Sequence, residues 1–234
     1  RRNLFVDAHS GADRTFRYHA LFRDFLLRRG EEEMPSALRH AHRRRIAALL
    51  LDAGDTDEAL HILIEIGDWE RAERVLLEAA PRYIQSDRYV KLNNWIGVFP
   101  EDRLRQSGWL QYWLATSCLP LDPQRARMVF EQAHARFQSD GDHTGGLVAC
   151  AGVIDALQLA LVDCRARGAW VERLNRALDA APVPIAPEVE ARAVCARFIG
   201  SLYGPSAHPD LPSWAERAKR LVLASEHPTL RIQT

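Results

Sequence analysis

The sequence predicts an all-α fold, an array of helical hairpins preceded by one small β-hairpin. Three observations predict it. Apolar residues recur at helical spacing through almost all of the chain after residue 35. Proline, serine and glycine separate these segments at the positions where helices begin and end. A pattern of small, large and small residues then recurs along the helices, as in proteins built from repeats.

The first 18 residues differ from the rest of the chain. A short apolar segment, Asn3–Asp7, is followed by turn-forming residues at 9–13 and by alternating apolar residues in Thr15–Tyr18. This order predicts a β-hairpin. Leucines and phenylalanines at helical spacing then predict a helix over 19–29, which Gly30 and the Glu31–Glu33 run are expected to end.

The next segments have the apolar spacing of amphipathic helices, and each is followed by a glycine or a proline. We expect the third of them to end before Pro81 and the fourth to end at Pro100. The predicted helices cover residues 36–51, 59–66, 69–79 and 92–99.

The recurring pattern has a small or apolar residue, a large one four positions later and another small one three positions after that. Offsets of four and three place all members on one helical face. Three later copies begin at residues 126, 170 and 214, which are 44 residues apart and leave room for one hairpin each. A non-repetitive helical bundle is the alternative. Two copies fit the pattern well, Ala72–Leu76–Ala79 and Ala126–Phe130–Ala133. The others depart from it: Ala59–Leu63–Ile66 fits loosely, Trp170–Leu174–Ala177 has a larger first residue, and Trp214–Ala218–Leu221 is a weak last copy.

The partner helices of these hairpins are predicted over 109–118, 147–164 and 189–202. The middle one is apolar on nearly all sides, so we expect it to be buried between its neighbours. A proline at 182 is expected to close the helix that begins near Trp170.

The composition argues against several classes of partner. The chain has 31 basic and 31 acidic residues, so its neutral charge provides no long-range attraction to DNA or to an anionic membrane. No segment has the roughly 18 uninterrupted apolar residues that span a bilayer. Four cysteines without a C-x-x-C pair indicate free, buried thiols and a cytoplasmic protein. They are Cys118, Cys150, Cys164 and Cys195.

Three sequence stretches, taken in order, resemble the MalT-like, LuxR-type transcriptional regulators, which are signal-transduction ATPases of the STAND class. NLFVDAHSGADRTFRYHALFRDFLLRR resembles the end of the family's winged-helix domain. AGDTDEALHILIEIGDWERAERVLLEAA resembles the short helical repeats that follow it, and YVKLNNWIGVFPEDRLRQSGWLQYWLA resembles the stretch leading into a TPR-like α-α superhelix. The resemblance implies the C-terminal part of a winged-helix domain at 1–33, short helical repeats (the arm) at 34–106 and TPR-like hairpins at 107–234.

The family's architecture implies an ATPase module before this segment and a DNA-binding helix-turn-helix after it. The sequence has no G-x-x-x-x-G-K-[ST] phosphate loop and starts at Arg1 without an initiator Met. We therefore expect an internal piece of a longer regulator. It would carry no cofactor itself, whereas the full-length protein would bind ATP or ADP.

Tyr18, His19, Ala20 and Leu21, followed by Asp24, resemble the Met-His-Asp motif of related STAND ATPases. The resemblance implies that His19 approaches the phosphates of ADP in the full-length protein. Ala20 replaces the aspartate of that motif. The alternative is that His19 packs the hairpin against the following helix.

A basic cluster occupies Arg39 to Arg45. Its residues wind around a helix instead of forming one stripe, so a solvated surface, facing Glu31–Glu33 or another domain, explains it better than a nucleic-acid contact. His40 and His42 do not share a helical face and cannot chelate a metal as an i, i+4 pair does. The sequence contains no G-x-S-x-G elbow, and its carboxylates lie on polar faces beside arginines. We therefore predict no metal site and no enzymatic activity.

Four aromatic residues close in sequence are the candidates for binding a ligand or partner: Trp95, Trp109, Tyr112 and Trp113. Aromatic rings supply contact area together with polar groups. The alternative, that they fill the core between hairpins, stays open for each of them.

The leading functional hypothesis is a sensor segment of a transcriptional activator, which binds an inducer or a regulatory protein and relays the signal to the ATPase module. The DNA-binding domain of the same parent chain would contact the promoter, so this segment would bind no nucleic acid directly. A TPR-like protein–protein scaffold without small-molecule sensing is the second hypothesis. A helical enzyme is the third, and it would need a pocket of titratable groups that the sequence does not indicate.

Overall fold

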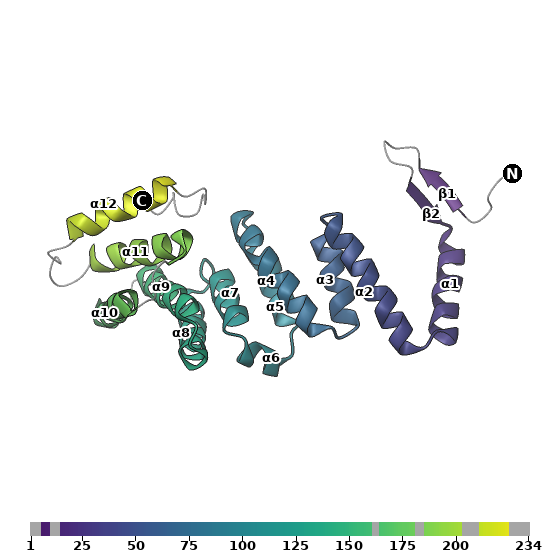
Figure 1. Ribbon diagram of the computed structural model, residues 1–234, viewed down its shortest axis with the longest axis horizontal. Helices are drawn as coiled ribbons and strands as arrows, with labels where there is room; N and C mark the ends of the chain where they lie inside the picture. Colours follow the sequence, from purple (N-terminus) through teal and green to yellow (C-terminus); the bar gives the residue numbers. More distant parts are fainter. Residues whose placement is uncertain (1–5, 10–14, 161–163, 181–184, 203–210, 225–234) are drawn as a thin grey trace. The chain divides into compact units, whose positions relative to one another are not determined.

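The computed structural model describes residues 6–9, 15–160, 164–180, 185–202 and 211–224 (Figure 1). The chain divides into two compact units, Arg1–Ala72 and Glu73–Thr234. Apart from two short strands, the regular structure in the described ranges is helical, so the expected all-α class is confirmed.

The first unit begins with strand β1 (Val6–His9), which pairs antiparallel with β2 (Thr15–Tyr18), Val6 lying opposite Tyr18. Helix α1 (Ala20–Glu33) follows and continues past Gly30, where we expected it to end. The three glutamates after Gly30 are good helix formers, which offsets the cost of about 1 kcal/mol for a glycine in a helix. The helix ends at Met34, whose extended conformation is the one required before Pro35.

Helices α2 (Ser36–Asp52) and α3 (Thr56–Glu65) pack against each other in the first unit. Two arginines of the basic cluster connect them to neighbouring carboxylates. Arg43 pairs with Glu65, and Arg44 Nε lies 2.6 Å from Asp68 Oδ2. At least part of this cluster therefore makes ion pairs within the unit.

The remaining helices follow in order along the chain (Figure 1). Short turns separate the first several of them. They are α4 (Trp69–Gln85), α5 (Tyr89–Gly97), α6 (Glu101–Gln106), α7 (Gly108–Cys118), α8 (Pro123–Asp140), α9 (His143–Leu159), α10 (Cys164–Ala180), α11 (Pro187–Leu202) and α12 (Leu211–Ala224).

Two expectations about these helices are wrong, and one helix is additional. Helix α4 continues through Pro81 to Gln85, and Tyr83 beyond the proline is buried, so packing outweighs the missing N–H. Helix α6 was not predicted. The helix expected over 147–164 ends at Leu159, and Cys164 already belongs to α10. The expected stop at residue 182 lies outside the described residues.

The recurring small–large–small pattern marks the buried faces, as predicted. The central residue of each of the five copies is at most 2% exposed to solvent. These residues are Leu63, Leu76, Phe130, Leu174 and Ala218. The copies beginning at 126, 170 and 214 fall on α8, α10 and α12, so one helix of each later hairpin carries the pattern.

Helix α9 lies at the centre of the second unit and contacts α7, α8, α10 and α11. All residues from Gly145 to Leu157 are buried, which confirms the expectation of a helix enclosed by its neighbours. A Cβ atom added at Gly152 would lie 2.5 Å from Cε1 of Phe130, so glycine is what allows α8 and α9 to approach this closely.

The thiols of Cys118, Cys150 and Cys195 are free and buried, as expected. Burial raises the pKa of Cys150 to about 12 and also raises the pKa of Cys195. The structure describes the backbone of Cys164 but not its side chain. None of the helices in the described ranges has the length and apolar character needed to cross a membrane.

Candidate functional site

The site is built around the turn between α8 and α9. Gly141 follows α8 with a φ of 71°, a left-handed conformation that glycine adopts without steric cost. The backbone N–H of Asp142 then donates to the carbonyl oxygen of Phe137 at 2.9 Å and closes the helix end. Asp142 is thereby placed before α9, where its Oδ1 accepts a hydrogen bond from the N–H of Gly145 at 2.8 Å.

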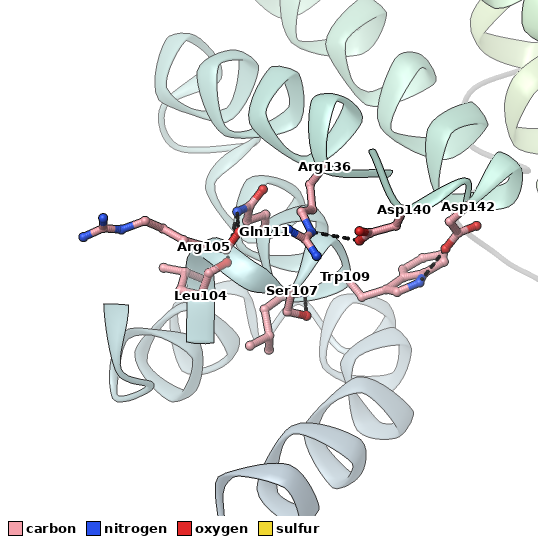
Figure 2. A network of polar contacts seen from close by, with 9 residues as sticks. Leu104, Arg105, Ser107, Trp109, Gln111, Arg136, Asp140 and Asp142 are labelled. Carbon is pink, nitrogen blue, oxygen red and sulfur yellow. Dashed lines mark hydrogen bonds and ion pairs between the residues drawn. The ribbon is translucent and has the colours of Figure 1, made fainter. Parts of the chain in front are cut away.

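The second carboxylate oxygen of Asp142 holds Trp109 on α7. The indole Nε1 of Trp109 donates to Asp142 Oδ2 at 3.1 Å (Figure 2). The Trp109 ring meets Phe137 edge to face, with 5.0 Å between centroids, and Tyr112 at 5.7 Å. A single carboxylate therefore caps α9 and orients an aromatic ring of α7.

Phe137 of α8 fits between two glycines. A Cβ atom added at Gly108 would lie 2.7 Å from its Cε1, and one added at Gly145 would lie 2.3 Å from its Cδ1. Real Cβ atoms do not approach so closely, so the ring occupies space that only these two glycines leave at the starts of α7 and α9. Close packing of this kind restricts the movement of the Phe137 ring.

Polar contacts hold the junction between α6 and α7 (Figure 2). Gln111 Nε2 donates to the carbonyl oxygens of Leu104 and Arg105, at 3.0 and 3.2 Å. These carbonyls belong to the last turn of α6 and have no partner within the helix. At the start of α7, the hydroxyl of Ser107 accepts a hydrogen bond from the N–H of Leu110 at 3.2 Å. Hydrogen bonds at the end of α6 and at the start of α7 therefore hold in place the backbone beside Trp109.

A hollow of about 320 Å³ lies against these residues. This volume is within the range of sites for small organic molecules. Three carboxylates and one guanidinium line it beside the two aromatic rings. Among the carboxylates, Asp140 also pairs with Arg136 Nε at 2.8 Å. The lining residues are Glu73, Arg103, Gln106, Ser107, Gly108, Trp109, Phe137, Asp140 and Asp142. Carboxylates accept hydrogen bonds and rings supply apolar area, so the hollow suits a ligand with hydroxyl or ammonium groups.

The four aromatic candidates have different surroundings. Trp109 lines the hollow. Tyr112 is buried, with its ring 5.1 Å from that of Trp113 and 5.7 Å from that of Phe130, so it belongs to the core. Trp113 is half-buried beside it. Trp95 is half-buried on α5 and is not among the residues that line the hollow.

The side chain of His19 is exposed at the start of α1, and its carbonyl oxygen accepts a hydrogen bond from the N–H of Arg23 at 2.9 Å. The contact between β2 and α1 is made instead by Tyr18 and Phe22, whose ring centroids are 5.7 Å apart.

One buried ion pair was not predicted from the sequence. Asp155 of α9 forms an ion pair with Arg192 of α11, and Arg192 also hydrogen-bonds to Tyr112 of α7. Burial alone would lower the pKa of Arg192, but the Asp155 carboxylate and Tyr112 outweigh burial and raise it. Asp155 could have indicated this ion pair, because it is the single charged residue in the apolar segment 145–157.

Residues 1–38 match the family model for the MalT winged helix domain. No curated protein and no solved structure significantly matches the chain. The matched segment contains β1, β2 and α1 and ends early in α2. The N-terminal segment is therefore similar to the winged-helix domain of MalT, a match that supports the MalT-like resemblance.

Proposed function

We propose that this chain is the regulatory segment of a LuxR-type, STAND-class transcriptional activator. Its later hairpins form a TPR-like superhelix that binds an inducer or a partner protein. Two observations support the assignment of the segment: residues 1–38 match the MalT winged helix domain, and packed helices follow in the order that the resemblance implies.

The observation that carries the binding role is the hollow beside Trp109. It joins an oriented indole and a buried phenylalanine to three carboxylates. Such a combination of apolar surface and a few fixed polar groups is characteristic of small-molecule sites. We infer that the inducer is a small organic molecule with hydrogen-bond donors, bound against Trp109.

The position of Asp142 supports the proposed relay. Its carboxylate connects α7 to the start of α9 through Trp109 and Gly145. A ligand that binds better to one arrangement of this contact shifts the protein toward that arrangement. The change in helix packing would then reach an ATPase module outside this chain, where ATP or ADP binds and His19 approaches the phosphates. The segment itself acts in the cytoplasm by binding, without cofactor or catalysis, and the DNA-binding domain of the parent protein contacts the promoter.

Calorimetric titration of the purified chain tests this proposal, with glucose, glycerol and putrescine as hydroxylated and cationic probes. We expect saturable binding of at least one probe and its loss in Trp109→Leu. Trp113→Phe is the matched control, because Trp113 is also an α7 aromatic but does not line the hollow. In the full-length regulator, Trp109→Leu should likewise abolish induction of a reporter, whereas Trp113→Phe should retain it.

Two results would overturn the sensor role. One is a complete lack of binding to all three probes together with unchanged reporter induction in Trp109→Leu. The other is binding that Trp109→Leu and Trp113→Phe weaken equally. Thermal unfolding of each variant separates a lost contact from a lost fold.

A protein–protein scaffold is the second candidate, and exposed apolar side chains in the second unit favour it. Leu121, Met128 and Leu159 are 71%, 52% and 56% exposed. Such residues can form the centre of a protein interface when they lie together. A stable protein partner recovered by pull-down, lost in Met128→Glu and retained in Trp109→Leu, would favour this scaffold over the sensor.

A further inference from the structure

A second hollow, of about 540 Å³, lies among α10, α11 and α12. The described residues that line it carry three guanidinium groups and one carboxylate, so their net charge is opposite to that of the residues lining the hollow beside Trp109. The lining residues are Asn175 and Asp179 of α10, Arg197 of α11, and Ser213, Trp214, Arg217 and Arg220 of α12. We propose that this hollow binds a small organic anion, a metabolite that carries a phosphate or several carboxylates.

Arg197 is held in place before any ligand arrives. Its guanidinium carbon lies 4.1 Å from the centroid of the Trp214 ring. A planar guanidinium stacked on an aromatic ring has lost part of its side-chain freedom already, so less entropy is lost when it binds an anion. Trp214 is itself buried, which fixes the platform.

Arg217 is fixed by a carboxylate outside the hollow. Its Nε donates to Glu190 Oε1 at 3.0 Å, and its Nη2 contacts the same oxygen. A guanidinium has five N–H donors, and this bond leaves those on Nη1 outside it. Arg220 lies three residues later on α12, so the two arginines are neighbours on one helical face.

The concentration of positive charge indicates the ligand class. Among the described residues that line the hollow, three are arginines and one, Asp179, is a carboxylate. Like charges gathered in a hollow repel one another, and an oxyanion relieves this repulsion while accepting bidentate hydrogen bonds from guanidinium groups.

The volume of the hollow and one side-chain oxygen without a partner further define the class of ligand. A volume of 540 Å³ exceeds that of a lone inorganic ion and lies in the range of metabolite sites. Oδ1 of Asn175 is shielded from solvent and has no hydrogen-bond partner in the described part of the chain. A hydroxyl or N–H group of a ligand that reaches this amide would satisfy it, so the anion should also carry a donor.

The experiment titrates the purified full chain with citrate and glucose 6-phosphate, at constant ionic strength, with glucose as the uncharged match. We expect saturable binding of at least one anion, which raises the thermal unfolding midpoint. Glucose should bind only at the hollow beside Trp109, so Arg220→Gln should leave the glucose titration unchanged. Arg220→Gln and Arg217→Gln should each weaken the binding about tenfold or more, because each removes hydrogen bonds to a charged group. Citrate and glucose 6-phosphate distinguish a carboxylate from a phosphate ligand.

Arg127→Gln is the matched control, since Arg127 is a surface arginine of α8 whose Nε lies 3.6 Å from Glu131. It should leave the affinity unchanged, and so should Trp109→Leu, because the anion site does not depend on the hollow beside Trp109. Absence of saturable binding of both anions, or equal weakening by Arg127→Gln and Arg220→Gln, would overturn the proposal. If Arg217→Gln does not fold, Arg220→Gln decides, because Arg220 is exposed and its replacement removes no buried side chain.

Discussion

Asp155 of α9 and Arg192 of α11 form an ion pair inside the helical stack of the second unit, with side chains that are 8% and 18% exposed. Arg192 also hydrogen-bonds to Tyr112, so α7, α9 and α11 share one polar contact. Removing charges from water costs several kcal/mol per ion, and the attraction within the pair roughly balances that cost. We therefore expect the pair to specify how these helices align more than it stabilises them.

Replacing one member of the pair should be much more harmful than replacing both. Asp155→Leu leaves the Arg192 charge without its carboxylate and should lower the free energy of unfolding by about 3 kcal/mol or more. Arg192→Met should have a similar effect. The double variant removes both charges, and its stability should lie within about 1 kcal/mol of the original. Urea unfolding of the four proteins measures the coupling, and additive losses would contradict a mutually compensated pair.

Asp142→Ala should destabilise the protein more than Asp122→Ala does. Both residues cap a helix: Asp122 Oδ1 accepts the N–H of Arg125 at 3.0 Å, and Asp142 Oδ1 accepts that of Gly145 at 2.8 Å. The loss of a cap costs about 1 kcal/mol. Asp142 also holds Trp109, so its replacement should cost about 2 kcal/mol in total. Equal losses in urea unfolding would show that the bond to Trp109 contributes nothing.

Replacement of two helical glycines by alanine should change the stability of the protein in opposite directions. A Cβ at Gly152 would lie 2.5 Å from the buried ring of Phe130, whereas nothing lies within 4 Å of a Cβ at Gly168 on α10. Gly152→Ala should therefore lower stability by about 1 kcal/mol or more, since overpacking outweighs the gain in helix propensity. Gly168→Ala should raise stability by about 0.5–1 kcal/mol. The thermal unfolding midpoints give the two signs, and a stabilised Gly152→Ala would contradict the close approach of α8 and α9.

The helical faces could be predicted from the sequence because they depend on local spacing. Phe130 and Leu174 are buried for the same reason that they fit the repeated pattern: each is flanked by apolar residues one helical turn away. Local propensity was less informative where packing competes with it. Pro81 was expected to end a helix, yet α4 continues beyond it to Gln85.

The site was only partly predictable because its contacts are distant in sequence. Trp109 was singled out from its composition and spacing, but its partner Asp142 is 33 residues away. The turn at Gly141 and Asp142 carries a recognisable end-and-cap signal, which could have placed the carboxylate before a helix. Nothing in local spacing could have paired Asp155 with Arg192, since they lie on different helices and meet only through the packing of α9 on α11.

His134 of α8 should make the protein less stable as the pH falls below about 6.5. Its ring is buried, its Nδ1 lies 3.2 Å from the carbonyl oxygen of Gly146, and it meets the Trp170 ring at 5.2 Å. Burial lowers the pKa of His134, the bond to Gly146 opposes this, and the nearby charge of Arg173 lowers it further. Below the unfolded pKa, the unfolded chain takes up a proton that the folded chain resists, so the free energy of unfolding decreases.

The test compares the free energy of unfolding at pH 7.5 and pH 5.5 in the original protein and in His134→Gln. The original should lose more stability over this interval than His134→Gln, because the variant lacks the group whose protonation favours unfolding. His143→Gln is the control, since His143 is exposed at the start of α9 and should leave the pH dependence unchanged. The same loss in His134→Gln as in the original would exclude His134 as the origin of this pH dependence, even if the variant is less stable at both pH values.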